Sequence, residues 1–362
     1  MFEKDGIILA YAPVVNELQS FDKVFRHITF IGMEDRKRQQ NAVLEITSKN
    51  IEPYILPQIG GNSIFEKLKV LFYLPILVII LAAKIRNHDV IHTRGPCYPA
   101  YVAVWLSWIF QKKIWWNKFA TNWQNDKSSF AFRLHKVILI NSIFAKTTIN
   151  GNWPDLPAHV LPFENPCLRD EQIEQGNKIV KTKQFIKPFK LVFIGNIEKT
   201  KGIYELFKAL QQLDRKDWNS LEIIGNGSEM PQIVKLASLY DGKVVIHGSI
   251  HSDLVHSILS KTHFLLLPSY SEGFPKVIAE AACWGCIPVV SAVGSIPQYV
   301  IDGENGFLWD IQGADSFSNI LDIALNTNKL KLKSISQNAS TMANLFSFDR
   351  YIKRIEKEVL GD

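Results

Sequence analysis

Short apolar runs alternate with helical patterns along nearly the whole chain of 362 residues. This alternation is typical of parallel β-sheets joined by crossover helices. In the first half, runs such as 6–11 and 89–92 read as strands, and the pattern restarts at 190–194. Between the halves, residues 169–190 carry many charges and little apolar periodicity, which favours a linker. The sequence therefore predicts an α/β protein with two sheet-containing domains.

Composition places the chain among globular proteins and narrows its partners. Hydrophobic residues make up 47% and charged residues 21%, which excludes a disordered chain. The 41 Lys+Arg against 35 Asp+Glu give a formal net charge of +6. A mildly basic chain suits an anionic small ligand or an anionic membrane surface. We expect no nucleic-acid partner, because no dense basic stripe or nucleic-acid-binding signature is present.

The chain has four cysteines, and two of them, Cys283 and Cys286, form a C-x-x-C pattern. This pattern suggests either a redox or metal site or two small core residues. No second Cys or His pair completes a zinc site. The pair also ends the apolar segment AEAACWGC, which favours packing. We expect no disulfide scaffold and no bound metal.

An apolar stretch at residues 70–83 raises the question of a membrane. It is shorter than the roughly 20 residues that span a bilayer, and Pro75 interrupts it. A buried helix is therefore the first expectation, and membrane contact is the alternative. A second apolar stretch, 98–110, is followed by QKKIWW, whose aromatic residues and lysines suit a membrane interface or a core helix leading into a strand. The N-terminus does not resemble a signal peptide.

Residues 193–202, FIGNIEKTKG, read as a strand, a polar loop and the start of a helix. Gly195 allows a sharp turn at the strand end. The N–H groups of the helix N-terminus suit a phosphate, and Lys201 adds a full positive charge there. The alternative is a solvated lysine near a helix start, since many strand–loop–helix turns contain a glycine and a lysine.

A stronger signal lies at residues 268–288, PSYSEGFPKVIAEAACWGCIP. Glu272 falls in the loop before a predicted helix that begins at Pro275, and Glu280 falls about 7 Å along that helix. A carboxylate accepts two hydrogen bonds from neighbouring hydroxyls, as in a ribose or hexose, and N–H groups near Gly273 and Phe274 suit a diphosphate. The alternatives are a helix-dipole role for Glu272 and a solvated face for Glu280. An apolar neighbourhood makes an unpartnered Glu280 costly, which favours a functional role.

These residues lead to a known family. SEGFPKVIAEA resembles the E-x7-E motif of retaining glycosyltransferases of family 4, which have the GT-B fold of two Rossmann-like domains facing across a cleft. Further segments resemble family motifs in the expected order: FIGNIEKTKG, IIGNG, HG, SAVGSIPQYV and DGENG. FSFD near the end resembles the family's F-S-W-D before a helix that crosses back to the first domain. We therefore expect domains at 1–175 and 176–345 and a returning segment at 346–362.

The resemblance implies roles for individual residues. Lys201 would neutralise the diphosphate leaving group, Glu272 would contact the donor sugar, and Glu280 would hold the ribose hydroxyls. Lys201 and Glu272 are thus the candidate catalytic residues. The full set of predicted donor-binding residues is Gly195, Asn196, Lys201, Gly225, Glu272, Gly273, Phe274, Pro275 and Glu280.

The chain departs from the family pattern at three of these motif positions. Asn196 stands where relatives have an arginine, and Lys199 is a candidate to supply the missing charge. Gln298 replaces a glutamate and Ser295 replaces a glycine in the SAVGSIPQYV loop. These departures concern the phosphate geometry and leave the expected fold unchanged.

The first half resembles the family less closely. DVIHTRGP is similar to the family's D-V-I-H-x-H strand end, so His92 and Arg94 would face the cleft. KFATNW resembles the K-Y-A-G-N-W segment of polysaccharide-assembly members. No histidine stands in this segment near the expected reacting sugar. The candidate acceptor-side residues are His92, Arg94, Lys118, Asn122 and Trp123, and packing is the alternative for each.

The sequence thus predicts a retaining glycosyltransferase that moves a sugar from a nucleotide-diphosphate donor to a saccharide or lipid-linked saccharide. We expect no cofactor and no obligatory metal, since no Asp-x-Asp motif follows a strand. A cytoplasmic protein that touches the inner face of a membrane is expected. The alternatives are an epimerase or phosphorylase on the same fold, and a non-catalytic partner that binds a nucleotide sugar. A two-carboxylate glycosidase is disfavoured, because both carboxylates flank one helix N-terminus.

Overall fold

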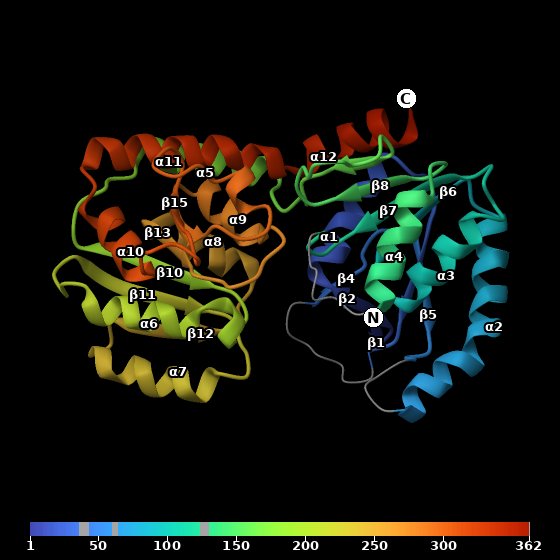
Figure 1. The fold of residues 1–362 in the computed structure, drawn as a ribbon, viewed down its shortest axis with the longest axis horizontal. Coiled ribbons are helices and arrows are strands. Elements are labelled where there is room, and N and C mark those ends of the chain that lie inside the picture. The colour runs from blue at the N-terminus through green and yellow to red at the C-terminus, as the bar shows by residue number, and fades with distance from the viewer. Residues whose placement is uncertain (36–42, 60–63, 124–129, 362) are drawn as a thin grey trace. The chain divides into compact units, whose positions relative to one another are not determined.

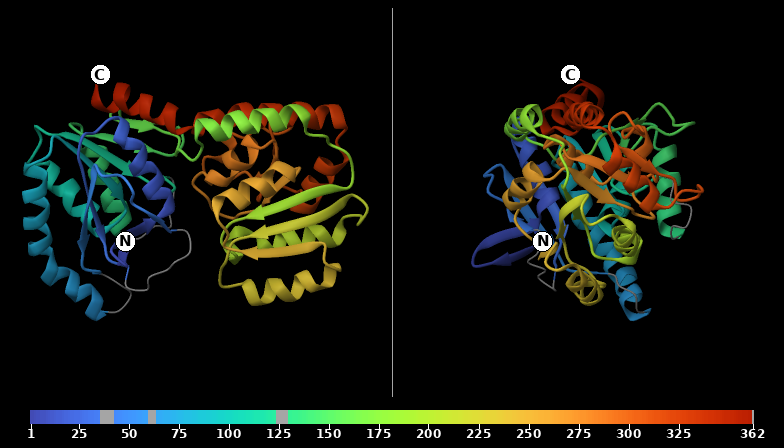
Figure 2. Two further views of the ribbon diagram at one scale, coloured as in Figure 1. Left: turned by 180° about the vertical axis from the view of Figure 1, so that it is seen from behind. Right: turned by 90° about the vertical axis from the view of Figure 1, so that its left-hand side faces the viewer.

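The computed structural model describes residues 1–35, 43–59, 64–123 and 130–361 (Figures 1 and 2). The chain forms two compact units. The first contains Met1–Phe163 and Tyr351–Asp362, and the second contains Glu164–Arg350. The boundary expected at 175/176 therefore lies inside the second unit, and the segment expected at 346–362 is divided between the two.

The second unit is built on one parallel six-stranded sheet. Its strands lie in the order β12-β11-β10-β13-β14-β15. The strand bounds are β10 Phe189–Ile194, β11 Trp218–Ile224, β12 Val244–Gly248, β13 Phe264–Leu267, β14 Ile287–Ser291 and β15 Phe307–Trp309. The helices are α5 Asp170–Thr182, α6 Ile203–Gln212, α7 Met230–Ala237, α8 Ser252–Lys261, α9 Lys276–Cys283, α10 Phe317–Asn326 and α11 Lys329–Ala343.

This strand order is that of a doubly wound nucleotide-binding sheet. Successive strands β10, β11 and β12 extend the sheet in one direction, and β13, β14 and β15 extend it in the other. The reversal lies between β10 and β13, where Leu191 pairs with Phe264. Ligands of such sheets bind at the carboxyl ends of the strands beside the reversal, so the fold points to the loops that follow β10 and β13.

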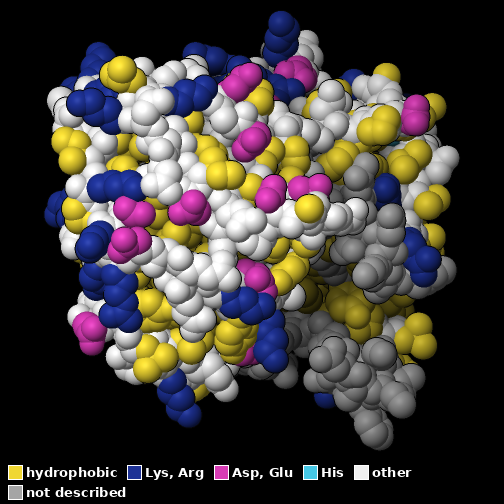
Figure 3. All heavy atoms as spheres, turned by 60° about the vertical axis from the view of Figure 1, so that its left-hand side comes forward, with side chains coloured by type: hydrophobic (Ala, Val, Ile, Leu, Met, Phe, Trp, Pro, Cys, Tyr) yellow, Lys and Arg dark blue, Asp and Glu magenta, His cyan; other side chains and the backbone are white. Residues whose placement is uncertain are grey.

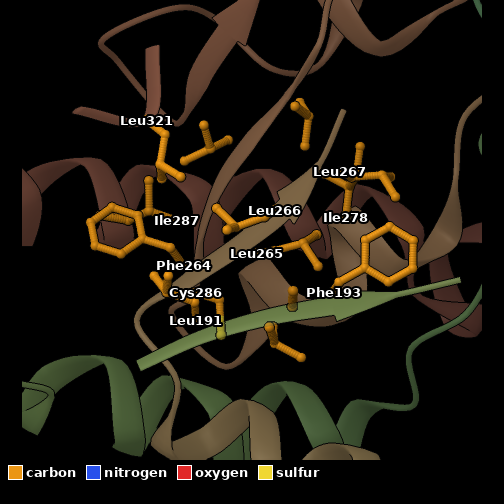
Figure 4. Packing of buried hydrophobic residues seen from close by; sticks show 14 of the residues in the cluster. Leu191, Phe193, Phe264, Leu265, Leu266, Leu267, Ile278, Cys286, Ile287 and Leu321 are labelled. Atoms are coloured by element: carbon orange, nitrogen blue, oxygen red, sulfur yellow. The ribbon is translucent and has the colours of Figure 1, made fainter. Parts of the chain in front are cut away.

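The central strands of this sheet are apolar on both faces because helices cover both of them. Phe264, Leu265 and Leu266 of β13 are fully buried, as is Ile278 of α9. Figure 4 shows these side chains packed with Leu191, Phe193, Ile287 and Leu321. A strand buried on both faces reads as a continuous apolar run, as HFLLL does in the sequence.

The prediction of a linker at 169–190 is wrong, because α5 occupies most of this segment. Asp170 and Glu171 lie in its first turn and Lys181 in its last, which suits the helix dipole. Its inward face includes Gly176, where a Cβ would lie 2.2 Å from the carbonyl oxygen of Cys283 on α9. Helix α5 therefore packs closely against α9 through a glycine. A search for regularly spaced large apolar residues does not detect such a helix.

The described residues of the first unit form three smaller sheets. Strands β6 to β9 form a parallel sheet, β3 and β5 form a parallel pair, and β1, β2 and β4 form an antiparallel sheet. The strand bounds are β1 Phe2–Lys4, β2 Ile7–Tyr11, β3 Ile28–Met33, β4 Val43–Glu45, β5 Ile51–Leu56, β6 Val90–Gly95, β7 Ile114–Phe119, β8 Lys146–Ile149 and β9 Val160–Pro162. The helices are α1 Ala12–Ser20, α2 Ile64–Arg86, α3 Tyr98–Ser107, α4 Phe130–Asn141 and α12 Phe348–Arg354.

Two features of the first unit qualify the sequence analysis. The apolar run at 6–11 forms β2, but it pairs antiparallel with β1 and β4 rather than joining a parallel sheet. The stretch at 70–83 lies within α2, which packs on the core through Leu77, Leu81 and Ile85. Within the part of the chain that is described, no helix combines the length and the apolar character needed to span a membrane.

The end of the chain packs into the first unit. Tyr351 and Ile352 of α12, and Ile355 and Val359 after it, are buried in a cluster with Trp116 and other residues of that unit. Arg354 donates a hydrogen bond to the carbonyl oxygen of Pro162, which ties the segment to β9. The segment therefore completes the first core although it follows the whole second unit in the sequence.

Cys283 and Cys286 are buried and reduced in the core of the second unit, in agreement with the packing interpretation. Burial raises the pKa of Cys283 to about 12, so the thiol stays protonated. Beside them, the buried ammonium of Lys183 donates to the carbonyl oxygens of Leu259, Thr262 and Trp284 at 3.2, 2.6 and 2.6 Å. These carbonyls lie near the C-terminal ends of α8 and α9, so one lysine satisfies groups of two helix ends.

Replacing Lys183 by alanine should destabilise the protein, because three buried carbonyl groups lose their donor. We expect a loss of about 3 kcal/mol or more in the free energy of unfolding, measured by urea denaturation. The matched control is Lys181→Ala, whose side chain is exposed and whose loss should change stability by no more than about 0.5 kcal/mol. Equal stability of the two variants would contradict this role for Lys183.

Candidate functional site

The predicted donor-side residues gather at the strand-order reversal of the second unit. The loop after β10 contains Gly195 and Asn196, and a short 3-10 turn, Lys199–Lys201, leads into α6. The loop after β13 leads into α9. The backbone N–H of Tyr270 donates to the carbonyl oxygen of Thr200 at 2.9 Å, which joins the two loops.

Lys201 and Glu272, the two candidate catalytic residues, form an ion pair across these loops. Lys201 Nζ lies 2.6 Å from Glu272 Oε1. The side chain of Lys201 is 24% exposed and that of Glu272 is 9% exposed, so the lysine is the more accessible to a ligand. A charge-assisted pair of this kind holds both side chains at the strand ends.

Two glycines allow the loops to approach this closely. Gly202 has φ +68°, and a Cβ there would lie 1.8 Å from the carbonyl oxygen of Pro268. Gly225, at the end of β11, has φ +136°, and a Cβ there would lie 1.9 Å from the carbonyl oxygen of Gly195. Both positions require glycine, because other residues rarely adopt these angles and the space is filled by backbone.

The predicted contacts from the loop after β13 are mainly backbone groups. The ring of Phe274 is buried and stacks on Phe346 with centroids 4.5 Å apart, so its side chain serves the core. The carbonyl oxygen of Gly273 accepts from the N–H of Ser295 at 2.9 Å. The sequence predicts Pro275 to be the first residue of the helix, but it directly precedes α9, which begins at Lys276. Asn196 is exposed at the end of β10, where the resembling family has an arginine.

Glu280 lies on α9 between buried alanines and is half-buried. Burial raises the pKa of its carboxyl group, and the nearby Lys276 opposes the shift. Lys276 Nζ itself donates to the carbonyl oxygen of Pro166 at 2.7 Å. In the described part of the chain, the carboxylate of Glu280 has no hydrogen-bond or salt-bridge partner. A ligand with hydrogen-bond donors could supply the partners that this carboxylate lacks.

In the first unit, the structure brings together three acceptor-side candidates around a carboxylate that the sequence analysis missed. Glu17 of α1 is buried, with a side chain 3% exposed. Its two oxygens accept from Arg94 and Lys118, each at 2.6 Å, and Tyr351 donates to it at 2.8 Å. A carboxylate on the apolar helix APVVNELQS was the available signal.

His92 adjoins this cluster. Its ring stacks on Trp116 with centroids 3.8 Å apart, and Nδ1 lies 3.1 Å from the carbonyl oxygen of Trp116. Burial lowers the pKa of His92 to about 4, while Glu17 opposes the shift and Lys118 adds to it. The imidazole is therefore neutral at pH 7 and able to accept or donate one hydrogen bond.

Asn122 and Trp123 follow β7 and are placed differently. The indole of Trp123 is buried against Phe119, with ring centroids 4.9 Å apart, and Lys136 Nζ lies 4.7 Å from the ring centroid of Trp123. Trp123 thus packs in a core of the first unit, as its alternative interpretation proposed. Asn122 is half-buried beside it.

A pocket of about 370 Å³ lies in the first unit between β3 and β6. Its volume falls within the range of small-molecule sites. Apolar side chains such as Phe30 and Ile91 line much of it, and Glu17, His92 and Arg94 contribute polar groups. In the described residues no group of three or more His, Cys, Asp or Glu is arranged to hold a metal ion.

Comparison with known proteins shows what the second unit is similar to. Residues 175–342 match the family described as glycosyl transferases group 1. An uncharacterized glycosyltransferase of Haemophilus influenzae is 30% identical over 175 residues, 47% of this chain and 48% of that protein. The N,N'-diacetylbacillosaminyl-diphospho-undecaprenol alpha-1,3-N-acetylgalactosaminyltransferase of Campylobacter jejuni is 28% identical over 162 residues, 44% of this chain and 42% of that protein. The chain spans about half the length of these curated relatives.

Solved structures extend the likeness to both units. A structure of Anabaena Alr3699/HepE in complex with UDP has a TM-score of 0.71 at 15% identity, covering 98% of this chain and 97% of that chain. WaaG, a glycosyltransferase involved in lipopolysaccharide biosynthesis, has a TM-score of 0.65 at 14% identity, covering 96% and 95%. The fold is therefore the GT-B fold of two Rossmann-like α/β domains. Residues 175–342, most of the second unit, are similar to the glycosyl transferases group 1 family.

The buried cluster around Glu17 should depend on its negative charge. Glu17→Gln leaves Lys118 and Arg94 without their counter-charge, and breaking a buried pair in this way costs about 3–5 kcal/mol. We expect a loss of that order in the free energy of unfolding by urea, whereas Glu45→Gln, at an exposed position, should have little effect. A Glu17→Gln protein as stable as the control would show that water already compensates these charges.

Proposed function

We propose that the chain is a retaining glycosyltransferase that moves a sugar from a nucleotide-diphosphate donor to a saccharide or lipid-linked saccharide. The observation that carries the proposal is the half-buried carboxylate of Glu280, which has no hydrogen-bond or salt-bridge partner in the described residues. It lies on α9, the helix that follows the loop in which Glu272 pairs with Lys201, at the strand-order reversal. This arrangement offers an acceptor for paired hydroxyls and a cation for a phosphate at one sheet edge.

Each of the three side chains has a proposed role. Glu280 accepts hydrogen bonds from the two ribose hydroxyls, which would give its carboxylate the donors that the protein does not supply. Lys201, the more exposed member of the ion pair, stabilises the negative charge that develops on the diphosphate leaving group. Glu272 contacts the donor sugar and keeps Lys201 in position. The backbone N–H groups at the start of α9 add partial positive charge, and no cofactor or metal ion is invoked.

The acceptor side is proposed to lie in the first unit, at the pocket that His92 and Arg94 line. A neutral His92 and a charged Arg94 suit a sugar hydroxyl and an anionic group. The Campylobacter relative is named for a diphospho-undecaprenol substrate, and WaaG for lipopolysaccharide biosynthesis. These names support a role in cell-surface polysaccharide synthesis. We propose that the chain acts on the cytoplasmic face of a membrane.

A second candidate is a nucleotide-sugar-binding partner of a synthase that does not itself catalyse transfer. The exposed Asn196 favours it, because this position then lacks a cation for the phosphates. Incubation of the purified chain with nucleotide sugars separates the candidates: release of the nucleoside diphosphate supports the transferase, and binding without release supports the partner.

Glu280→Gln should weaken nucleoside diphosphate binding by about tenfold. The substitution replaces the charged carboxylate that accepts from the ribose hydroxyls by a neutral amide oxygen. Calorimetry with uridine and guanosine diphosphates measures this, with the exposed Glu304→Gln as control. Wild-type affinity should also fall as the pH is lowered through the raised pKa of Glu280, and the variant should lack this dependence.

The same substitution should not destabilise the protein without nucleotide. At neutral pH the ionised Glu280 is the disfavoured form in the folded state, as the direction of its pKa shift shows. We expect the melting temperature of Glu280→Gln to equal or exceed that of the wild type. Unchanged affinity for both nucleotides, or a large loss of stability, would mean that Glu280 serves the fold.

Lys201→Ala should lower kcat by about 10²–10³-fold with a smaller change in KM, because the charge acts mainly in the transition state. The control Lys208→Ala removes an exposed lysine from α6 and should keep full activity. A fully active Lys201→Ala enzyme would refute the role, and a matching loss in Lys199→Ala would assign it to the neighbouring lysine.

A further inference from the structure

Residues 70–83 of helix α2 in the first unit are apolar around the whole circumference of the helix, but they are covered on one side only. Leu77, Leu81 and Ile85 pack in the core. The opposite side is open to solvent, with Phe72 79% and Ile79 69% exposed. A helix that is hydrophobic all round is normally buried on all sides, so this side requires a partner. Its exposed apolar residues are Leu71, Phe72, Leu74, Ile76, Val78 and Ile79.

The neighbouring helices continue this surface. Helix α3 packs beside α2, since Leu77 and Leu106 belong to one core cluster, and its Trp105 is 66% exposed. Trp105 and Val137 of α4 line one shallow hollow. We call the exposed apolar residues of α2, α3 and α4, together with Trp108 directly after α3, the apolar surface; beyond α2 they are Trp105, Trp108, Leu134 and Val137. Groups of exposed apolar side chains on neighbouring helices mark interaction sites.

The segment of the chain that carries the apolar surface has few acidic residues. Residues 69–149, which include most of α2, all of α3 and α4, and β6 to β8, contain 11 Lys and Arg and 2 Asp and Glu. The rest of the chain has 41 − 11 = 30 basic and 35 − 2 = 33 acidic residues. The net charge of +6 therefore resides in this segment. By contrast, Figure 3 shows basic and acidic side chains interspersed on the face that it presents.

Exposed basic side chains lie within the helices and loops that form the apolar surface. They are Lys69 near the start of α2, Arg86 at its end, Lys112 after α3, and Arg133 on α4. Each would lie near the headgroups if the apolar residues entered a bilayer interface. Basic residues next to exposed tryptophans and aliphatic side chains are the pattern of a surface that lies on an anionic membrane.

A second copy of the chain fits this surface less well. In a two-fold dimer each copy presents the same residues, so the basic rims of two apolar surfaces would face each other and repel. An anionic lipid surface instead pairs with these charges while its acyl region receives the apolar side chains. Charge complementarity therefore favours a lipid partner.

We propose that the apolar surface of α2, α3 and α4 is a membrane-docking surface for anionic lipids. Phe72, Ile76, Ile79, Trp105 and Trp108 enter the interface, and the surrounding lysines and arginines contact lipid phosphates. The inference deepens the proposed function, on which it rests for its purpose: docking brings the first unit to a lipid-linked acceptor. The binding itself does not depend on catalysis.

The test is flotation of the full chain with phosphatidylcholine vesicles, with and without phosphatidylglycerol, at low and high salt. Wild type should float with the anionic vesicles at low salt and less at high salt. Phe72→Ser with Ile79→Ser should weaken binding about tenfold or more. The matched control is Leu239→Ser with Leu254→Ser, which changes two exposed leucines of the second unit and should bind like the wild type.

Three results would overturn the proposal: no flotation of the wild type at low salt, equal binding by the α2 double variant, or a wild-type dimer that the double variant abolishes without a change in flotation. Nucleoside diphosphate binding, measured on the same proteins, separates this inference from the proposed function. A wild type that binds the nucleoside diphosphate but does not float with anionic vesicles rejects the docking surface alone. Intact flotation without nucleotide binding rejects the donor site alone.

Discussion

The parallel pairing of β10 with β13 determines where the second unit can bind a ligand. Because the strand order reverses between these strands, their carboxyl ends are neighbours, and the loops that follow them form the edge where ligands of such sheets bind. Lys201 and Glu272 are 71 positions apart in the sequence and meet only because their strands are neighbours. The glycines at 202 and 225 serve the same geometry, since they let backbone segments from different loops touch.

The carboxylates of Glu17, which is buried, and Glu280, which is half-buried, differ in whether the protein supplies them with partners. Glu17 is surrounded by Arg94, Lys118 and Tyr351, so its charge is compensated within the first unit. Glu280 has its pKa raised by burial and lacks such partners in the described residues. An isolated carboxylate in an apolar setting costs stability, and proteins retain such groups where a ligand supplies the compensation. The presence or absence of protein partners is therefore better evidence of a ligand-binding role than the fact that the residue is a glutamate.

The first unit has well-packed cores but also leaves large apolar side chains exposed on one helix. Its cores are closed by the C-terminal segment, where Tyr351 and Ile355 pack against Trp116 and other residues, yet α2 leaves Phe72 and Ile79 exposed. Acidic residues are scarce in the same region, since only 2 of the 35 Asp and Glu of the chain lie within residues 69–149. In the proposed function these features are related: the acceptor pocket between β3 and β6 and the apolar surface belong to one unit, so a lipid-linked acceptor and its membrane would engage the same part of the chain.

Local patterns in the sequence determined the α/β class, the strands of the second unit and the positions of Lys201, Glu272 and Glu280, because each depends on neighbours within one strand–loop–helix segment. Tertiary structure decided the rest. Helix α5 was hidden since Gly176 matters only against the backbone of Cys283. Glu17 was missed because its cations lie 77 and 101 positions away. Side chains so distant in sequence meet only where the fold makes their strands and helices neighbours. The periodicity of apolar residues does not show which elements will be neighbours.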